Sequence, residues 1–282
     1  MLPGGAPLAR CPVWPGLILL GVAVGAYGTM IGAGGGFVLV PVLLLLYPGD
    51  PPELVTSISL AVVFFNALSG TAAYVRQRRV DYLAANAFAL ATVPGALAGA
   101  FAVSLFARRL FDGVFALVLL LAAAFLLLGP SGRVVQRRYR RGEVTRRITD
   151  ALGDTYVYSY SLPLGVVLSL MVGFLSSLLG IGGGIIHVPA MVQLLRFPAH
   201  VATATSHYVL TVTALTGTLV HVLAGDLEGG YARTGALAAG VLIGAQLGAR
   251  LSLRLGGLGI VRLLALALAA VAVRLLIEAL SG

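Results

Sequence analysis

The sequence predicts an all-α, polytopic membrane protein, and three observations lead to this fold class. Hydrophobic residues make up 59% of the 282 residues and charged residues only 10%, whereas ordinary globular domains have roughly 45–50% and 25%. Uncharged stretches recur along the whole chain, and a helix needs about 20 apolar residues to cross a bilayer. Two of these stretches are interrupted by a run of glycines followed by a proline.

Eight hydrophobic segments follow from the uncharged stretches. The first and fifth would each be about 60 Å long as unbroken helices, twice the bilayer core of about 30 Å. Because glycine and proline disfavour helix, we expect each to contain two shorter helices joined at membrane depth. The alternative is that part of each stretch is an uncharged loop outside the membrane. The segments are 15–47, 54–75, 82–107, 111–128, 162–195, 199–224, 231–253 and 258–280.

The two interruptions share one pattern, which indicates an internal duplication. Gly-x-Gly-Gly-Gly-x4-Pro occurs at 32–41 and again at 180–189. Three further blocks recur in the same order in each half, and four ordered matches predict two repeats of four segments whose shared interface is central. The further blocks pair 55–57 with 204–206, 67–71 with 214–218, and 95–100 with 244–249. The predicted regions are an N-terminal tail (1–14), membrane repeat 1 (15–129), a basic linker (130–161) and membrane repeat 2 (162–282).

The positive charge marks the orientation of the chain in the membrane. All 19 basic residues are arginine, and seven of them lie between Arg133 and Arg147. Basic loops stay in the cytoplasm, so the linker is predicted to be cytoplasmic. The net charge is +9, but the positive residues lie between hydrophobic stretches. This distribution argues against nucleic acid as a partner.

The relative orientation of the two halves stays open at this point. Broken segments that span the membrane would make the halves parallel, and re-entrant segments would make them inverted. Arginine counts do not decide between these arrangements. We favour inversion because re-entry explains the double length of the broken segments. Inverted halves place the loops near Asp50 and Asp226 outside, and those near Arg78 and Arg196 inside.

The glycine breaks are the first candidates for a binding site. A half-helix that begins after the glycines would direct unpaired N–H groups and a positive dipole end into the protein, which favours an anion. The alternative is close helix packing through small residues, since Gly28 and Gly32 precede Gly36 at four-residue spacing. The candidate substrate-binding glycines are Gly34, Gly35, Gly36, Gly182, Gly183 and Gly184.

Hydroxyl side chains and histidines in the segments are the second group of candidates. Their hydroxyl groups would donate to an anion, although such hydroxyls often bond to their own helix. An ionisable group inside a membrane segment is a functional-site hypothesis, and a histidine supplies counter-charge or carries a coupling proton. The alternative is a neutral histidine that bonds to another helix. The candidates are Thr56, Ser57, Thr205, Ser206, His187 and His207, whereas His200 and His221 are expected near the membrane interface.

Several other function classes are excluded or disfavoured. The single Cys11 excludes an intrachain disulfide, and the apolar stretch that follows it is too long for a cleaved signal peptide. The sequence lacks the glycine-lysine phosphate loop of ATPases and the His-Glu-x-x-His motif of metalloproteases. We therefore expect no catalytic residues, cofactor or metal. A remote alternative is an intramembrane metalloenzyme that uses His187, His200, His207 and His221.

The duplicated glycine–proline blocks, with Thr-Ser pairs downstream in the same order, resemble the TauE/SafE family of sulfite and organosulfonate exporters. The resemblance covers nearly the whole chain except the linker and the extreme N-terminus. It implies a membrane transporter of small sulfur-containing anions. We expect a secondary transporter in the cytoplasmic membrane that works by alternating access; an anion channel is the alternative. Its expected partners are a small anion and the lipid bilayer, with a coupling proton or sodium ion and a homo-oligomer left open.

Overall fold

The chain is mainly helical in a computed structural model that describes residues 13–105, 108–128, 143–255 and the single residues 259, 262, 266 and 270. Among these residues, six helices are long and apolar enough to cross a membrane. They are α1 (Val13–Ile31), α3 (Pro52–Arg76), α4 (Tyr82–Ala102, continued by a short 3-10 turn at Val103–Leu105), α6 (Leu162–Leu179), α8 (Ala199–Ala224) and α9 (Tyr231–Ser252). A further helix, α5 (Arg108–Leu128), precedes the linker. The eighth expected segment, 258–280, lies almost wholly outside the described residues.

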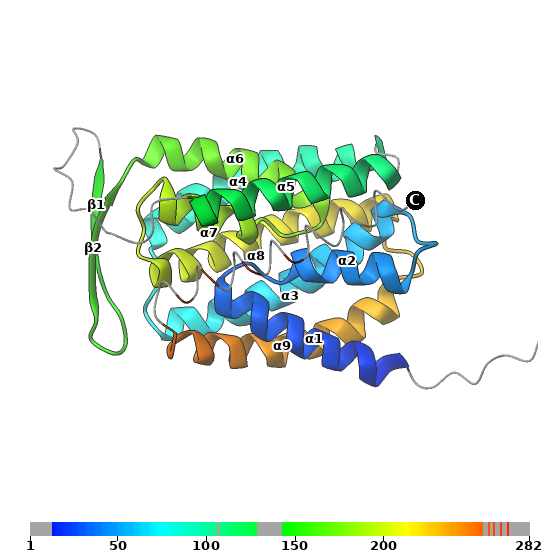
Figure 1. The fold of residues 1–282 in the computed structure, drawn as a ribbon, viewed down its shortest axis with the longest axis horizontal. Helices are drawn as coiled ribbons and strands as arrows, with labels where there is room; N and C mark the ends of the chain where they lie inside the picture. The colour runs from blue at the N-terminus through cyan, green and yellow to red at the C-terminus, as the bar shows by residue number, and fades with distance from the viewer. Residues whose placement is uncertain are drawn as a thin grey trace, which may run out of the picture.

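Both glycine motifs interrupt the helices, as the sequence predicted. Helix α1 ends before the first motif and α2 (Gly36–Leu46) follows it, while α6 and α7 (Gly184–Gln193) flank the second. In Figure 1, α1 runs from right to left and α2 turns back to the right, whereas α6 runs from left to right and α7 turns back to the left. Helices α2 and α7 have 11 and 10 residues, so each is about 16 Å long and too short to cross a bilayer. The chain therefore reverses its direction at each break.

Glycines bring the outer helices into backbone contact. Gly244 and Gly248 of α9 lie against the carbonyl oxygens of Val22 and Ala26 in α1. In the same way, Gly95 and Gly99 of α4 lie against the carbonyl oxygens of Leu170 and Phe174 in α6. Small residues permit this close approach between membrane helices. The repeated blocks at 95–100 and 244–249 are therefore explained by packing, and α3 and α8 pack together at the centre.

The connections between the helices lie at the two ends of the molecule, and ion pairs occur at both ends. At one end, Arg233 of α9 forms an ion pair with Asp50 in the α2–α3 connection. The other end carries the linker. There Arg79 forms an ion pair with Asp150 of the linker, and Nη1 of Arg196 lies 3.7 Å from Oε1 of Glu143. The loops near Asp50 and Asp226 thus share one end, and those near Arg78 and Arg196 share the other (Figure 1). This is the placement expected of inverted halves.

The linker contains a β-hairpin that the all-α prediction missed. Strands β1 (Val144–Thr149) and β2 (Thr155–Tyr160) pair antiparallel, and the hairpin extends beyond the helices at the left of Figure 1. Both strands are rich in β-branched or aromatic residues, and the turn between them contains Asp150, Gly153 and Asp154. This composition is typical of a hairpin. The cluster of arginines before it obscured the signal.

Two buried carboxylates anchor the hairpin to the helical bundle. Oδ2 of Asp150 accepts hydrogen bonds from Nη2 and Nε of Arg79 at 3.0 and 3.1 Å. Oδ2 of Asp81, the residue that caps α4, accepts the hydroxyl of Tyr158 at 2.6 Å. Burial by itself would raise the pKa of Asp150, but the Arg79 bonds and the N–H groups of Leu152 and Asp154 outweigh it and lower that pKa. The carboxylate is therefore ionised at neutral pH.

We predict that Asp150→Asn detaches the hairpin. Removing one partner of a buried ion pair costs about 3–5 kcal/mol, which corresponds to at least a hundredfold rise in the detached population. Chymotrypsin cleavage after Tyr158 and Tyr160, both buried in the docked hairpin, measures that population when docking is fast relative to cleavage. Asp154→Asn, an exposed carboxylate in the same turn, is the matched control.

The same experiment has a pH dependence with a defined sign. Because the pKa of Asp150 lies below its ordinary value of 3.8, its contribution to docking is complete above that value and is lost as pH falls through the lowered pKa. Equal cleavage rates in Asp150→Asn and the native protein at pH 7 would contradict this anchoring role.

Candidate functional site

The two glycine breaks touch each other at the centre of the described bundle. A methyl group built on Gly36 would lie 2.8 Å from the carbonyl oxygens of both Gly180 and Ile181. The reciprocal contact places Gly184 against the backbone of Gly32 and Ala33. Real Cβ atoms do not approach other atoms this closely. Glycine at the first position of α2 and of α7 is therefore required for the breaks to meet.

Backbone conformation explains the other candidate glycines. Gly34 and Gly182 both have φ of +76°, and the helix N-caps Gly35 and Gly183 have φ of +86° and +82°. L-amino acids with side chains rarely adopt this left-handed region. Four of the six glycines are thus needed to turn the chain, and the other two are needed for close contact.

Residues of the two central helices bind both breaks in matching ways. Val63 of α3 and Leu210 of α8 each contact the glycine in the middle of both breaks. The hydroxyl of Ser59 donates to the carbonyl of Gly180 at 2.6 Å, and the hydroxyl of Ser206 donates to the carbonyl of Gly32 at 3.5 Å. Each central helix therefore holds the break that belongs to the other end of the sequence.

Two helix N-termini converge at this contact. Helices α2 and α7 begin at Gly36 and Gly184, whose backbones adjoin the opposite breaks. The first N–H groups of a helix have no partner within it, and its N-terminus carries about half a positive charge. Within the described residues, no arginine forms an ion pair or hydrogen bond with either break. The centre therefore offers neutral hydrogen-bond donors and a positive potential, which suits an anion.

A closed hydrogen-bond network supports the first break. Nδ2 of Asn66 donates to the carbonyl of Gly34 at 2.9 Å, and the hydroxyl of Thr29 donates to Oδ1 of Asn66 at 3.1 Å. Nε2 of His207 lies 3.3 Å from the Thr29 hydroxyl. Since that hydroxyl donates to Asn66, Nε2 carries the proton and donates. The hydroxyl of Tyr74 completes the network by donating to the Thr29 carbonyl at 2.6 Å.

The two candidate histidines lie in separate surroundings. His207 adjoins the first break, beside the backbone of Gly32. His187 lies in the first turn of α7, but its Nε2 is 3.2 Å from the hydroxyl of Ser169, and its ring packs edge-on against Phe88. In the described structure, His207 therefore adjoins the first break and His187 adjoins the second.

The candidate hydroxyls divide into two groups. Thr56 lies beside Gly180, and Ser206 bonds to the first break. The hydroxyl of Ser57 instead donates to the Glu53 carbonyl of its own helix, and that of Thr205 accepts the N–H of Asp81. The structure thus brings the six glycines, Thr56 and Ser206 together, whereas the hydroxyls of Ser57 and Thr205 bond elsewhere.

Sequence reasoning missed several polar residues around the breaks. His221 lies in the last turn of α8, where it is fully buried and its Nδ1 is 2.7 Å from Oδ2 of Asp226 in the following connection; its position near the membrane interface stays a prediction. Hydroxyls one turn before each break were also overlooked, although their position next to the motif was a usable signal. These are Thr29, Ser176 and Ser177. In the part of the chain that the structure describes, no three His, Cys, Asp or Glu residues group closely enough to hold a metal.

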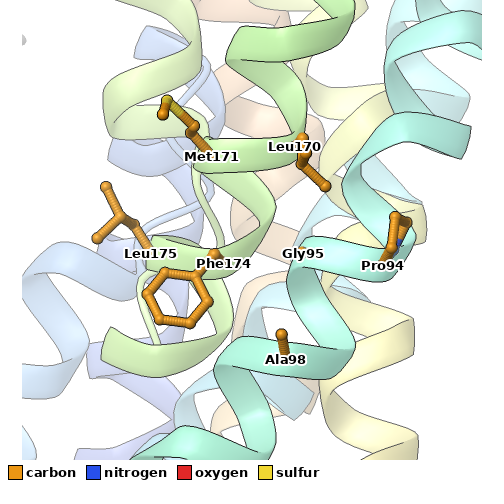
Figure 2. Close-up of a pocket in the computed structure, with 7 residues that line it drawn as sticks. All are labelled: Pro94, Gly95, Ala98, Leu170, Met171, Phe174 and Leu175. Atoms are coloured by element: carbon orange, nitrogen blue, oxygen red, sulfur yellow. The ribbon is translucent and has the colours of Figure 1, made fainter.

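A groove on the outer face is unsuited to an anion. It has a volume of about 480 Å³ and lies between α4 and α6, and Figure 2 shows its lining side chains on these two helices. All lining residues are apolar, so the groove suits lipid chains: they are Pro94, Gly95, Ala98, Leu170, Met171, Phe174 and Leu175. The glycine breaks remain the polar centre of the described bundle.

Comparison with known proteins identifies the family. The family model described as "Sulfite exporter TauE/SafE" matches residues 17–275. The chain belongs to the TauE/SafE family. Among its relatives is the probable membrane transporter protein YunE of Bacillus subtilis, 33% identical over 268 residues, which cover 93% of this chain and 97% of YunE.

More distant TauE/SafE relatives carry the same general description. The probable membrane transporter protein MJ0441 of Methanocaldococcus jannaschii is 26% identical, over 76% of this chain and 74% of its own length. The probable membrane transporter protein YjnA of Bacillus subtilis is 26% identical, over 84% of this chain and 91% of its own. No solved structure matches the chain. This TauE/SafE protein is a multi-pass membrane protein whose relatives are described as membrane transporters.

We predict that Gly36→Ala and Gly184→Ala destabilise the folded protein. Alanine is the better helix former by about 1 kcal/mol, so α2 and α7 gain local stability, but each methyl group would overlap the opposite break. Overpacking of this kind costs about 1–3 kcal/mol. Thermal unfolding in detergent should show lowered midpoints for both variants.

Gly235→Ala is the matched control, because Gly235 is also helical and has no atom within 4 Å of the added methyl group. Its midpoint should stay the same or rise. If Gly36→Ala and Gly184→Ala behave like this control, the two breaks are not in contact in the folded protein.

Proposed function

We propose that this TauE/SafE protein is a secondary transporter of a small anion, sulfite or a related organosulfonate, in the cytoplasmic membrane. The substrate would bind between the two glycine breaks. Access would alternate between the two sides of the membrane as the breaks separate toward one side or the other. The family assignment supports transport, and the family model's description as a sulfite exporter supports the sulfur oxyanion.

One observation carries the proposal: the N-termini of α2 and α7 each adjoin the opposite break inside the bundle, and no cationic side chain among the described residues bonds to either. Two positive dipole ends held within one contact region repel, and the cost is largest in a low-dielectric interior. An anion between them would remove this repulsion and accept the unpaired N–H groups. Irregular backbone at membrane depth is tolerated where it is buried in protein or lines a cavity.

The contacts also support two inverted repeats. Helix α1 packs on α9 as α6 packs on α4, and both breaks use Val63 and Leu210. Loops near Asp50 and Asp226 share the end opposite the hairpin. The basic linker favours a cytoplasmic hairpin end. Inverted repeats around a central site are a recurring architecture of secondary transporters.

The first test distinguishes a transporter from an anion channel. Purified protein in liposomes preloaded with unlabelled sulfite should take up labelled sulfite against its gradient, with the membrane potential clamped. Such counterflow requires a site that alternates between the two sides, and a channel cannot produce it. Protein-free liposomes control for leak. Electrogenic sulfite flux without counterflow would show that the protein is an anion channel and not a transporter.

The second test concerns orientation and uses single cysteines in a Cys11→Ser background. Gly49→Cys and Glu228→Cys, both exposed, should react with a membrane-impermeant thiol reagent added outside right-side-out vesicles. Leu194→Cys and Asp154→Cys, at the hairpin end, should react only after the vesicles are opened. Labelling of Gly49→Cys and Leu194→Cys from the same side of intact vesicles would contradict inverted repeats.

A further inference from the structure

The second break contains hydroxyl groups that have no partner in the described structure. The hydroxyls of Thr56, Ser176 and Ser177 are completely buried, and none has a hydrogen-bond partner. A buried hydroxyl without a partner costs about 1–3 kcal/mol, and native proteins keep few such groups. Two of these three residues, Thr56 and Ser176, adjoin the second break, and their unpaired hydroxyls call for an explanation.

Other hydroxyls in helices α3, α6 and α8 donate hydrogen bonds to the backbone of their own helix. Ser57 donates to Glu53, Ser169 to Gly165 and Thr203 to Ala199, each to the carbonyl four residues earlier. This is the usual behaviour of serine and threonine within helices. The hydroxyls of Thr56 and Ser176 make no such bond, so they are free to donate to something else.

Two of these residues, Ser176 and Thr56, lie at opposite ends of the second break. A methyl group built on Gly183, the N-cap of α7, would lie 3.2 Å from Oγ of Ser176. A methyl group built on Gly180 would lie 3.0 Å from Cα of Thr56. Ser177 instead adjoins Gly217 of α8, on another face of α6. Ser176 and Thr56 therefore flank the break together with the N-terminus of α7.

Backbone donors complete this arrangement. The N–H groups of Gly184 and Ile185 have no backbone acceptor among the described residues. The position of the Ser176 hydroxyl beside the N-cap of α7 brings a side-chain donor to the same place as these N–H groups. Unpaired donors of two chemical kinds therefore converge on one helix N-terminus.

The first break lacks this set of donors. The residue that corresponds to Ser176 is Gly28, which has no side chain, and it lies against Gly34 and Gly35. Thr203 corresponds to Thr56, because each lies beside the first glycine of the opposite break, and its hydroxyl is already bonded. Asn66 satisfies the carbonyl of Gly34. The two breaks are therefore alike in backbone and different in unused hydrogen-bonding capacity.

We propose that the anion binds chiefly at the second break, in a subsite formed by the hydroxyls of Ser176 and Thr56 and the N-terminus of α7, and that it is a singly charged oxyanion. This inference rests on the proposed transport function and deepens it. The donors are neutral, and among the described residues no charged side chain bonds to the break. Burying an ion costs energy that rises steeply with its charge unless a counter-ion is present, so this subsite selects against doubly charged anions.

The experiment measures sulfite binding and transport by the full-length protein in mildly acidic buffer, in which sulfite is mainly the singly charged hydrogensulfite ion. Sodium sulfite is titrated while the thermal unfolding midpoint is followed in detergent, and half-saturation of sulfite uptake is measured in liposomes. The variants are Ser176→Ala and Thr56→Val. Thr203→Val is the matched control, since it makes the same change at the corresponding position of the first break.

Ser176→Ala and Thr56→Val should leave the unfolding midpoint without sulfite unchanged or higher, because each removes a buried hydroxyl that has no partner among the described residues. Each should raise the half-saturating sulfite concentration about ten- to a hundredfold, the effect of losing one hydrogen bond to a charged ligand. Thr203→Val should change half-saturation less than about twofold. Methanesulfonate, which is singly charged, should compete with sulfite at lower concentration than sulfate, which is doubly charged.

Two results would overturn the subsite while leaving transport intact. In one, the native protein transports sulfite, and Ser176→Ala and Thr56→Val match Thr203→Val in half-saturation. In the other, sulfate competes better than methanesulfonate, which excludes the singly charged ligand. Failure of the native protein to bind or transport any of these oxyanions would overturn the proposed function and the subsite together.

Discussion

Backbone packed directly against backbone at the two glycine breaks is the constraint on which the rest of this structure depends. Gly36 and Gly184 begin two short helices at points where the opposite chain leaves no room for a side chain. The breaks can meet only if the chain reverses sharply before each helix, which the left-handed glycines allow. The central helices α3 and α8 then fill the remaining space with Val63 and Leu210. The close contact between the two breaks thus accounts for the polar centre, for the chain reversals before α2 and α7, and for the apolar side chains around them.

Much of this arrangement could be predicted from the sequence because glycine and proline act locally. A run of three glycines within an apolar stretch breaks a helix wherever it is placed, so both breaks and both short helices were predictable. The β-hairpin was predictable in principle from its β-branched and aromatic strands, but the cluster of arginines beside it led to the prediction of only a basic linker in an all-α protein. Local sequence signals therefore predicted the structure correctly at the breaks, where glycine dominates, and not at the hairpin.

The details of the site depend on helix faces, which sequence matching does not see. Matching Thr56 with Thr205 seemed natural because each precedes a serine, but the contacts pair Thr56 with Thr203 and Ser59 with Ser206. A shift of two residues turns a side chain by about 200° around a helix, so Thr205 faces Asp81 rather than the break. Whether a hydroxyl bonds to its own backbone, as Ser57 does, or stays unpaired, as Ser176 does, depends on rotamer and packing. Neither the rotamer nor the packing can be predicted from one sequence.

The glycine contacts of the outer helices have a consequence for how the protein is made. Helix α1 emerges from the ribosome before the other described helices, yet its close partner α9 is made after all the other elements from α2 to α8. Chains are produced at about 5–20 residues per second, so α1 waits many seconds in the membrane with its glycine-lined face uncovered. Lipid, an insertion factor or a temporary neighbour must cover that face meanwhile. Assembly of the described bundle is therefore completed only after α9 has been made, and the helices before the linker cannot reach their final packing by themselves.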